Sequence, residues 1–286
     1  MKTKLPALLL TLTLSLTACG AAPAATGSQS APDLSGAHAL PQTMEETPPV
    51  DLPTLRLTLV DGAGTDTLLL AGETAGEVYT VPADSFPLTL DGEPADASVL
   101  EDGMPLTVAY TGIEETFPAR LSIAAAEAYR LGTEKNPGGG FYDLCGLYLQ
   151  VLSDLAEGGE ETVAVDLSQA PGNLTEGEKA AIVWRFRELC GTGLADPESA
   201  APGTARFTIR EAGADGELCS LPTREEGEAY SLPVLRFEAE RSQTLPAGPD
   251  GTRPATARVL QDCFAVWPEF GAWTGYQVGS EVLACG

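Results

Sequence analysis

Between residues 55 and 124, apolar and polar side chains alternate in short runs that are separated by turn-forming pairs. The runs include LRLTLV at 55–60, MPLTVAYTG at 104–112 and ARLSIA at 119–124. Strict alternation is typical of half-buried β-strands. Asp-Gly pairs at 61–62, 91–92 and 102–103 supply the positive φ angles that tight hairpins need. Short, evenly spaced strands of this kind predict a small all-β barrel or sandwich.

After residue 141 the apolar positions recur every three or four residues, which is typical of amphipathic helices. We expect a first helix from Phe141 to Leu155 and a second helix that begins at a Thr175–Glu178 capping box and ends at Gly191. The expected apolar face of the second helix comprises Ile182, Val183, Phe186, Leu189 and Cys190. Apart from the strand VAVDL between the helices, only strands follow. This order predicts an α+β domain with two helices packed on an antiparallel-rich sheet.

The two patterns suggest two domains joined by a glycine-rich linker. We expect the small β domain at 54–131, the linker at 132–140 and the α+β domain at 141–286. The linker contains Gly138, Gly139 and Gly140, and a glycine run can also cradle a phosphate. A phosphate loop usually carries a lysine after its glycines, whereas Lys135 precedes them, so the linker interpretation is favoured.

The chain begins with a basic, then apolar, segment. Lys2 and Lys4 precede an uncharged run from Leu5 to Ala18, which is too short to span a bilayer and suits the apolar region of an export signal. The motif LTAC at 16–19 resembles the lipobox of bacterial lipoproteins. The resemblance implies that residues 1–18 are removed as a signal peptide and that Cys19 carries a diacylglyceryl group and an N-terminal acyl chain such as palmitate. An ordinary secretory signal with an incidental cysteine is the alternative.

Residues 19–53 contain many small residues and six prolines: Pro23, Pro32, Pro41, Pro48, Pro49 and Pro53. A segment with so few large apolar side chains cannot bury enough surface to fold, so we predict a disordered tether. It would connect a folded body to the outer face of the cell membrane. His38, the sole histidine, lies in this segment and is therefore a poor candidate for catalysis or zinc binding.

Two further regions of the chain resemble lipoproteins of Gram-positive gut anaerobes. LTVAYTGIEETFPARLSIA is similar to the last hairpin of small barrel domains in uncharacterised lipoproteins, a likeness which implies that Phe117 plugs the barrel end. LYLQVLSDL, LTEGEKAAIVWRF and the closing RVLQDCFAVWPEFGAWTGYQVGSEVLA resemble a carboxy-terminal domain of such lipoproteins, over residues 141–284. The family has no established activity. The resemblance therefore implies architecture and location, and no chemistry.

Charge and residue content exclude several classes of function. Without Lys2 and Lys4 the chain has 14 basic and 41 acidic residues, a net charge of −27, which repels nucleic acid. With one histidine, Ser-His-Asp and Cys-His sites lack a base. The cysteines form no C-x-x-C pair. The sequence therefore predicts no catalytic residue, no cofactor and no metal site.

The cysteines after Cys19 are odd in number. We expect Cys145 and Cys190, on the apolar helix faces, to be buried free thiols. A disulfide between Cys263 and either Cys219 or Cys285 is a less favoured possibility for an exported chain.

An aromatic stretch near the end of the chain is the one candidate binding surface. FAVWPEFGAWTGY, at 264–276, contains Trp267, Phe270, Trp273 and Tyr276. If exposed, these side chains would recognise a protein or glycan of the envelope; if buried, they would close the sheet against the helices, and the burial interpretation is favoured.

These observations predict a lipid-anchored, extracytoplasmic protein of the cell envelope. We expect a non-catalytic binding, sensor or scaffolding module. The alternative is an envelope hydrolase that uses a pair of carboxylates in a cleft between the domains. A cluster of carboxylates with raised pKa values in a deep pocket would favour the hydrolase, and an exposed aromatic patch would favour binding.

Overall fold

A computed structural model describes residues 51–136, 143–212, 219–222, 231–245, 247, 254–266 and 275–285. The predicted signal peptide, Cys19, the tether up to residue 50 and Gly138–Gly140 lie outside these residues. Residues 50–286 form one compact unit. No helix in the described ranges is long and apolar enough to cross a membrane.

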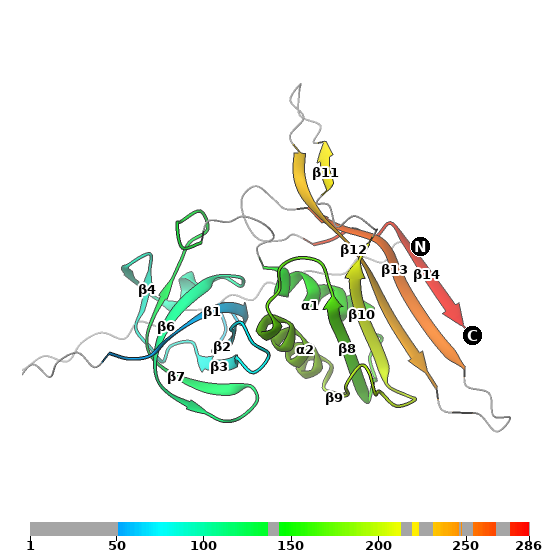
Figure 1. The fold of residues 1–286 in the computed structure, drawn as a ribbon, viewed down its shortest axis with the longest axis horizontal. Coiled ribbons are helices and arrows are strands. Elements are labelled where there is room, and N and C mark those ends of the chain that lie inside the picture. The colour runs from blue at the N-terminus through cyan, green and yellow to red at the C-terminus, as the bar shows by residue number, and fades with distance from the viewer. Residues whose placement is uncertain are drawn as a thin grey trace, which may run out of the picture. The chain divides into compact units, whose positions relative to one another are not determined.

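The first sheet closes on itself as a five-stranded barrel, one of the two forms that the alternating runs predict (Figure 1). Within the barrel, neighbouring strands are antiparallel except where β3 pairs with β7 in parallel through Tyr79 and Ala119, which closes the sheet. Closure removes the free edges of these strands. The barrel strands, in spatial order, are β3 (Val78–Pro82), β2 (Thr67–Ala71), β1 (Thr54–Asp61), β6 (Pro105–Glu114) and β7 (Ala119–Ala128).

A short hairpin extends the barrel sheet. It consists of β4 (Leu88–Leu90) and β5 (Glu93–Ala95), with β4 parallel to β7, and a 3-10 turn, η1 (Ala97–Val99), follows. The two residues between the strands, Asp91 and Gly92, have φ angles of 53° and 87°. Positive φ at both positions is what a type I′ hairpin turn requires. The Asp-Gly signal in the sequence is confirmed here.

The second sheet is mixed and contains the remaining strands. β9 and β10 run parallel to β8 on its two sides, and all other neighbours are antiparallel. The order is β14-β13-β12-β10-β8-β9, and β11 pairs with β12 off this path. The strands are β8 (Thr162–Gln169), β9 (Gly193–Leu194), β10 (Ala205–Glu211), β11 (Cys219–Pro222), β12 (Ser231–Thr244), β13 (Ala255–Val266) and β14 (Ser280–Cys285).

Both predicted helices are present, as α1 (Leu144–Leu155) and α2 (Glu176–Cys190). The Thr175 hydroxyl accepts a hydrogen bond from the Glu178 N–H at 3.0 Å, and the Glu178 carboxylate accepts one from the Thr175 N–H at 2.8 Å. This is the expected capping box, and Gly191 ends α2 with a φ of 65°. One expected apolar position is wrong, because Leu189 is 54% exposed. The buried side of α2 is instead centred on Ala181, Ile182 and Phe186.

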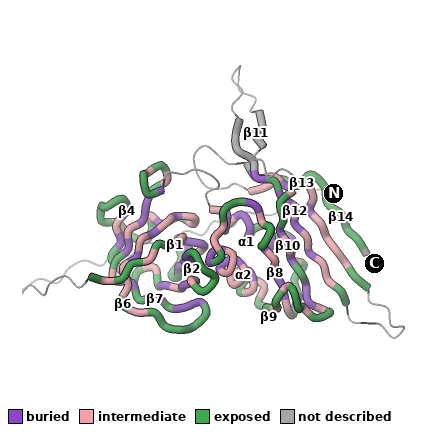
Figure 2. Tube along the Cα trace, viewed as in Figure 1, coloured by how far each residue is buried: buried purple, intermediate pink, exposed green. Residues whose placement is uncertain are grey.

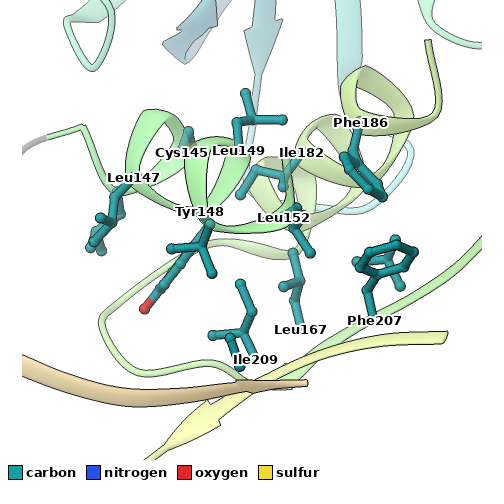
Figure 3. Packing of buried hydrophobic residues seen from close by; sticks show 14 of the residues in the cluster. Cys145, Leu147, Tyr148, Leu149, Leu152, Leu167, Ile182, Phe186, Phe207 and Ile209 are labelled. Atoms are coloured by element: carbon teal, nitrogen blue, oxygen red, sulfur yellow. The ribbon is translucent and has the colours of Figure 1, made fainter. Parts of the chain in front are cut away.

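The helices share a core with the second sheet. In Figure 3, Phe186 of α2 lies over Phe207 of β10, with ring centroids 4.9 Å apart and an edge-on angle of 71°. Tyr148 of α1 makes a similar contact with Phe237 of β12 at 6.2 Å, and its hydroxyl donates to the Pro171 carbonyl. Burial decreases from β8, β10 and β12 toward β14, whose described side chains are all exposed (Figure 2).

The same core extends into the barrel strands. Val60, Leu69, Ala71 and Val78 belong to the cluster of buried residues that contains the helices. At the beginning of α2, the Thr175 hydroxyl donates to the Gly72 carbonyl at 2.7 Å. These contacts fix α2 against the turn between β2 and β3.

Three cysteines are free thiols in the structure. Cys145 and Cys263 are buried free thiols, and Cys190 is a partly buried one. The prediction that Cys145 and Cys190 are free thiols is confirmed, but Cys190 is only partly buried. Because Cys263 is free, neither of the less favoured bridges, to Cys219 or to Cys285, is formed. Burial raises the pKa of the Cys263 thiol to about 12, so it is protonated and unreactive at neutral pH.

Candidate functional site

An open, largely apolar hollow lies between α2 and β8. We call it the α2–β8 groove. Its floor is the second half of β8, from Val165 to Ser168, and one wall is the outward side of α2, including Val183 and Trp184. Phe117 and Leu194 complete the apolar lining. Its volume is about 310 Å³, at the small end of ligand pockets, which suits one or two side chains better than a large cofactor.

Phe117 makes this hollow aromatic on two sides. The resemblance to lipoprotein barrels implies that Phe117 plugs the barrel end, and this expectation is wrong. The side chain is 57% exposed and is not part of the barrel core. It projects from the loop between β6 and β7 and lines the α2–β8 groove together with the half-buried Trp184. An exposed phenylalanine beside a tryptophan is a typical feature of a recognition surface.

The sheet edge along the floor of the groove is only partly covered. β9 is two residues long and pairs with β8 through Thr162 and Val163. The Gly193 N–H donates to the Glu161 carbonyl and the Ala195 N–H donates to the Val163 carbonyl, each at 2.9 Å. Beyond Val163, no strand in the described part of the chain pairs with this side of β8. The edge is therefore open where the groove lies.

The charges around the groove are mostly negative. Lys179 is paired with Glu176 at 2.9 Å. Arg187 lies 6.0 Å from the centre of the Trp184 ring and is paired with Glu188. Three further carboxylates lie at or next to the groove: Asp166 on its floor, and Glu114 and Glu115 just before Phe117. Among the described residues, none of the three forms an ion pair.

Three carboxylates gather at the beginning of α1, where barrel and helix meet. Asp143 caps α1 by accepting from the Gly146 N–H at 2.9 Å, and Asp102 accepts from the Ala63 N–H at 3.0 Å. Burial, together with the charges of Asp102 and Asp61, raises the pKa of Asp143 to about 7. Burial also raises the pKa of Asp102. Asp61 is paired with Arg185 at 2.5 Å.

Asp102 and Asp143 of this cluster have the raised pKa values of an acid–base site, and all three carboxylates are partly exposed. Each carboxylate is engaged by a backbone N–H or by Arg185, and neither the α2–β8 groove nor the second hollow is lined by Asp61, Asp102 or Asp143. Charge neutralisation and helix capping account for the contacts that the structure shows. No group of three metal-ligating side chains occurs among the residues described.

The second hollow lies at the barrel, near the turn after β1. It has a volume of about 260 Å³ and is lined in part by Asp66 and Asp84. The Ala83 N–H donates to the Asp66 carbonyl at 3.0 Å, which ties the two loops together. The described surroundings contain no histidine, lysine or arginine that would complete a catalytic set.

The predicted aromatic surface is described at one residue alone. Trp267, Phe270 and Trp273 lie outside the described residues. Tyr276 is half-buried, its ring is 5.6 Å from that of Phe237, and its hydroxyl donates to the Asp154 carboxylate at 3.1 Å. Burial raises the pKa of the Tyr276 phenol, so it stays protonated at neutral pH. At this position the aromatic side chain contacts the core.

Sequence reasoning did not find the α2–β8 groove. Its aromatic residues, Phe117 and Trp184, are 67 positions apart and carry no motif. Leu194, an apolar residue just after the end of α2 at Gly191, is exposed in the structure, and its position was the one weak indication of an apolar surface there. Comparison with protein families, curated proteins and solved structures finds none that matches this chain.

Proposed function

We propose that this chain is a lipid-anchored, extracytoplasmic, non-catalytic binding module of the cell envelope, with the α2–β8 groove as its binding site. The anchor rests on the LTAC motif that ends at Cys19 and on the proline-rich stretch that follows. Two acyl chains would hold the protein stably at a bilayer, and the stretch to residue 53 would separate the folded body from it. The net charge would keep that body away from anionic headgroups.

One observation carries the binding function. A large aromatic side chain, that of Phe117, is exposed at the rim of an apolar hollow instead of filling the barrel. Large apolar groups in a concave, partly exposed site are the common anchor points of binding surfaces.

We also propose a two-domain description of the folded body. The barrel and its hairpin, at 54–131, would form the first domain, and the helices with the second sheet, at 141–286, would form the α+β domain. Two separate clusters of buried residues support this division. The cluster that contains the helices and the second sheet also includes four barrel residues, so we expect the two domains to unfold together.

The alternative is a hydrolase that uses Asp143 as a general acid and Asp102 as its partner. The pKa of about 7 favours it, because an acid that is protonated near neutral pH can donate a proton. Neither of the two hollows described above is lined by these residues, and each carboxylate is held by a backbone N–H, which weighs against it.

The binding function is tested by a pull-down from detergent-solubilised envelope with three forms of the chain. Phe117→Asp places a charge at the groove. Ile113→Asp is the matched control, because Ile113 is also an exposed apolar residue of the β6–β7 hairpin, at 42% exposure, and does not line the groove. We expect the partners recovered by the wild type and by Ile113→Asp to be lost with Phe117→Asp. Equal recovery with both variants would contradict a binding role for the groove.

A further inference from the structure

We propose that the α2–β8 groove binds an extended, basic peptide segment that adds a strand to the open edge of β8 and places an apolar side chain between Phe117 and Trp184. The proposal rests on the proposed binding function and specifies the class of ligand. The partner is thus a polypeptide with lysine or arginine on either side of a large apolar residue.

The backbone of β8 supports strand addition. Val163 offers its carbonyl to the outer edge, where Ala195 donates to it at 2.9 Å. In a strand the peptide groups of alternate residues point to the same side, so those of Val165 also point to this edge. β9 ends before it can pair with Val165. An extended peptide can bind here through main-chain hydrogen bonds, with pockets for alternate side chains.

The position of the apolar hollow supports the same ligand. The groove is lined both by the main part of this edge, Val165–Ser168, and by Phe117, Val183 and Trp184. A strand paired with β8 would therefore direct one or two of its side chains toward an apolar hollow of about 310 Å³. β14 also lies at an edge of the second sheet, but its described side chains are exposed on both faces, and the two hollows described above do not border it. We therefore place the peptide at β8.

Charge selects a basic peptide over a second copy of this chain. Lys179 at the groove and Arg187 near it are already paired with glutamates of α2. Asp166 on the floor and Glu114 and Glu115 next to it outnumber Arg120, which lies opposite Glu114 in the β6–β7 hairpin, so negative charge is in excess around the groove. A second copy would bring a formal net charge of −25 to this surface, whereas a lysine- or arginine-containing peptide would be attracted to it.

The test uses the purified full-length chain and synthetic peptides of seven residues with blocked ends. The parent peptide alternates lysine with valine and leucine, and the matched acidic peptide has glutamate in place of each lysine. Two further isomers carry N-methyl groups on one or the other alternate set of amides, which removes the donors on one edge of the peptide strand. Affinities are measured by fluorescence anisotropy, and hydrogen exchange is followed in the segment 163–168.

We expect the parent peptide to bind and to slow hydrogen exchange in this segment. The acidic peptide should bind at least about tenfold more weakly. One N-methyl isomer should lose binding and the other should retain it, because a single edge of the peptide pairs with β8. Phe117→Ala should weaken binding by about tenfold, and Ile113→Ala, the matched control on the same hairpin, by less than about twofold.

Other outcomes overturn the proposal in distinguishable ways. Equal binding of both N-methyl isomers would rule out strand addition, and equal binding of the acidic peptide would rule out selection by charge.

Other ligands give different outcomes. If no peptide binds but decanol does, and Phe117→Ala loses decanol binding, the groove accepts a lipid: the peptide proposal fails and the binding function stands. A dimer in sedimentation that Phe117→Ala dissociates would assign the edge to a second copy. If no probe binds, the peptide proposal fails, and the envelope pull-down decides the binding function separately.

Discussion

Replacing Gly177 with alanine should lower the free energy of unfolding by about 1–3 kcal/mol, although alanine favours an isolated helix by about 1 kcal/mol. Gly177 lies in the first turn of α2, directly against the turn between β2 and β3. A β-carbon there would contact the Gly72 carbonyl oxygen and would lie 2.9 Å from both the Gly72 carbonyl carbon and the Thr74 carbonyl oxygen. All three are backbone atoms, which cannot rotate away as a side chain can.

The turn that Gly177 contacts is also held in place. The Glu77 carboxylate accepts from the Glu73 and Thr74 N–H groups at 2.8 and 2.9 Å, and the Gly72 N–H donates to the Glu77 carbonyl at 2.8 Å. The overlap must therefore be relieved by a shift of α2, which also forms one wall of the groove. Urea denaturation measures the loss, and we expect weaker peptide binding as a second consequence.

Gly76→Ala is the matched control for this prediction. Gly76 lies in the same turn, a β-carbon on it would contact nothing within 4 Å, and its φ angle is not positive. Alanine there should be neutral or should stabilise the protein by up to about 1 kcal/mol, since it restricts the unfolded chain. If both variants unfold at the same urea concentration as the wild type, α2 is not seated on this turn.

Replacing Asp143 with asparagine should stabilise the protein at neutral and higher pH by about 2–4 kcal/mol, because one pKa unit corresponds to about 1.4 kcal/mol. Burial and the neighbouring Asp102 and Asp61 raise the pKa of Asp143 to about 7 in the folded protein. In the unfolded chain its pKa is near 4. Asparagine keeps an oxygen that can accept from the Gly146 N–H, and it tolerates the φ of 54°.

The sign of the pH dependence follows from the direction of this shift. Between pH 4 and pH 7 the folded wild type retains a proton that its unfolded chain releases, so Asp143 makes the wild type less stable as pH rises through this window. Above pH 7 the full penalty is present. The advantage of Asp143→Asn should therefore be close to zero at pH 4, should grow up to pH 7 and should then remain constant. Urea denaturation at a series of pH values measures this difference.

Asp91→Asn serves as the control for this pH series. Asp91 has nearly the same backbone conformation, with a φ of 53°, but its carboxylate accepts from Arg130 at the surface, at 3.2 Å. Its replacement should lower stability by no more than about 1 kcal/mol. If the difference in the free energy of unfolding between the wild type and Asp143→Asn stays constant from pH 4 to pH 8, Asp143 ionises in an ordinary environment and the prediction is wrong.

Local patterns in the sequence predict much of this fold. The Asp91-Gly92 turn, the capping box at Thr175 and the stop at Gly191 depend on residues within a few positions of one another, and all three are present. Alternation along the first strands predicts a small barrel or sandwich, and the inward residues of the barrel that forms, such as Leu57 and Leu59, are buried. Local geometry dominates where a hydrogen bond or a φ angle decides the structure.

The sequence did not predict the features that depend on contacts between distant segments. Leu189 fits the helical period but is exposed, because α2 directs Ala181, Ile182 and Phe186 toward the core. Phe117 lines the groove together with residues of α2, and α2 itself contacts the β2–β3 turn through Thr175 and Gly72, which are 103 positions apart. The raised pKa of Asp143 similarly arises first from burial and then from the charges of Asp102 and Asp61, which are distant in the sequence.

That this protein works at a membrane surface is tested most directly by the mass of its mature N-terminus. The native protein, isolated from a bacterial membrane, is digested and the peptide that begins at Cys19 is measured, with a Cys19→Ser variant fractionated in parallel. We expect a diacylglyceryl thioether on Cys19 in the wild type, and recovery of the variant away from the membrane. An unmodified Cys19 thiol, together with wild-type protein in the medium, would contradict the proposed anchor.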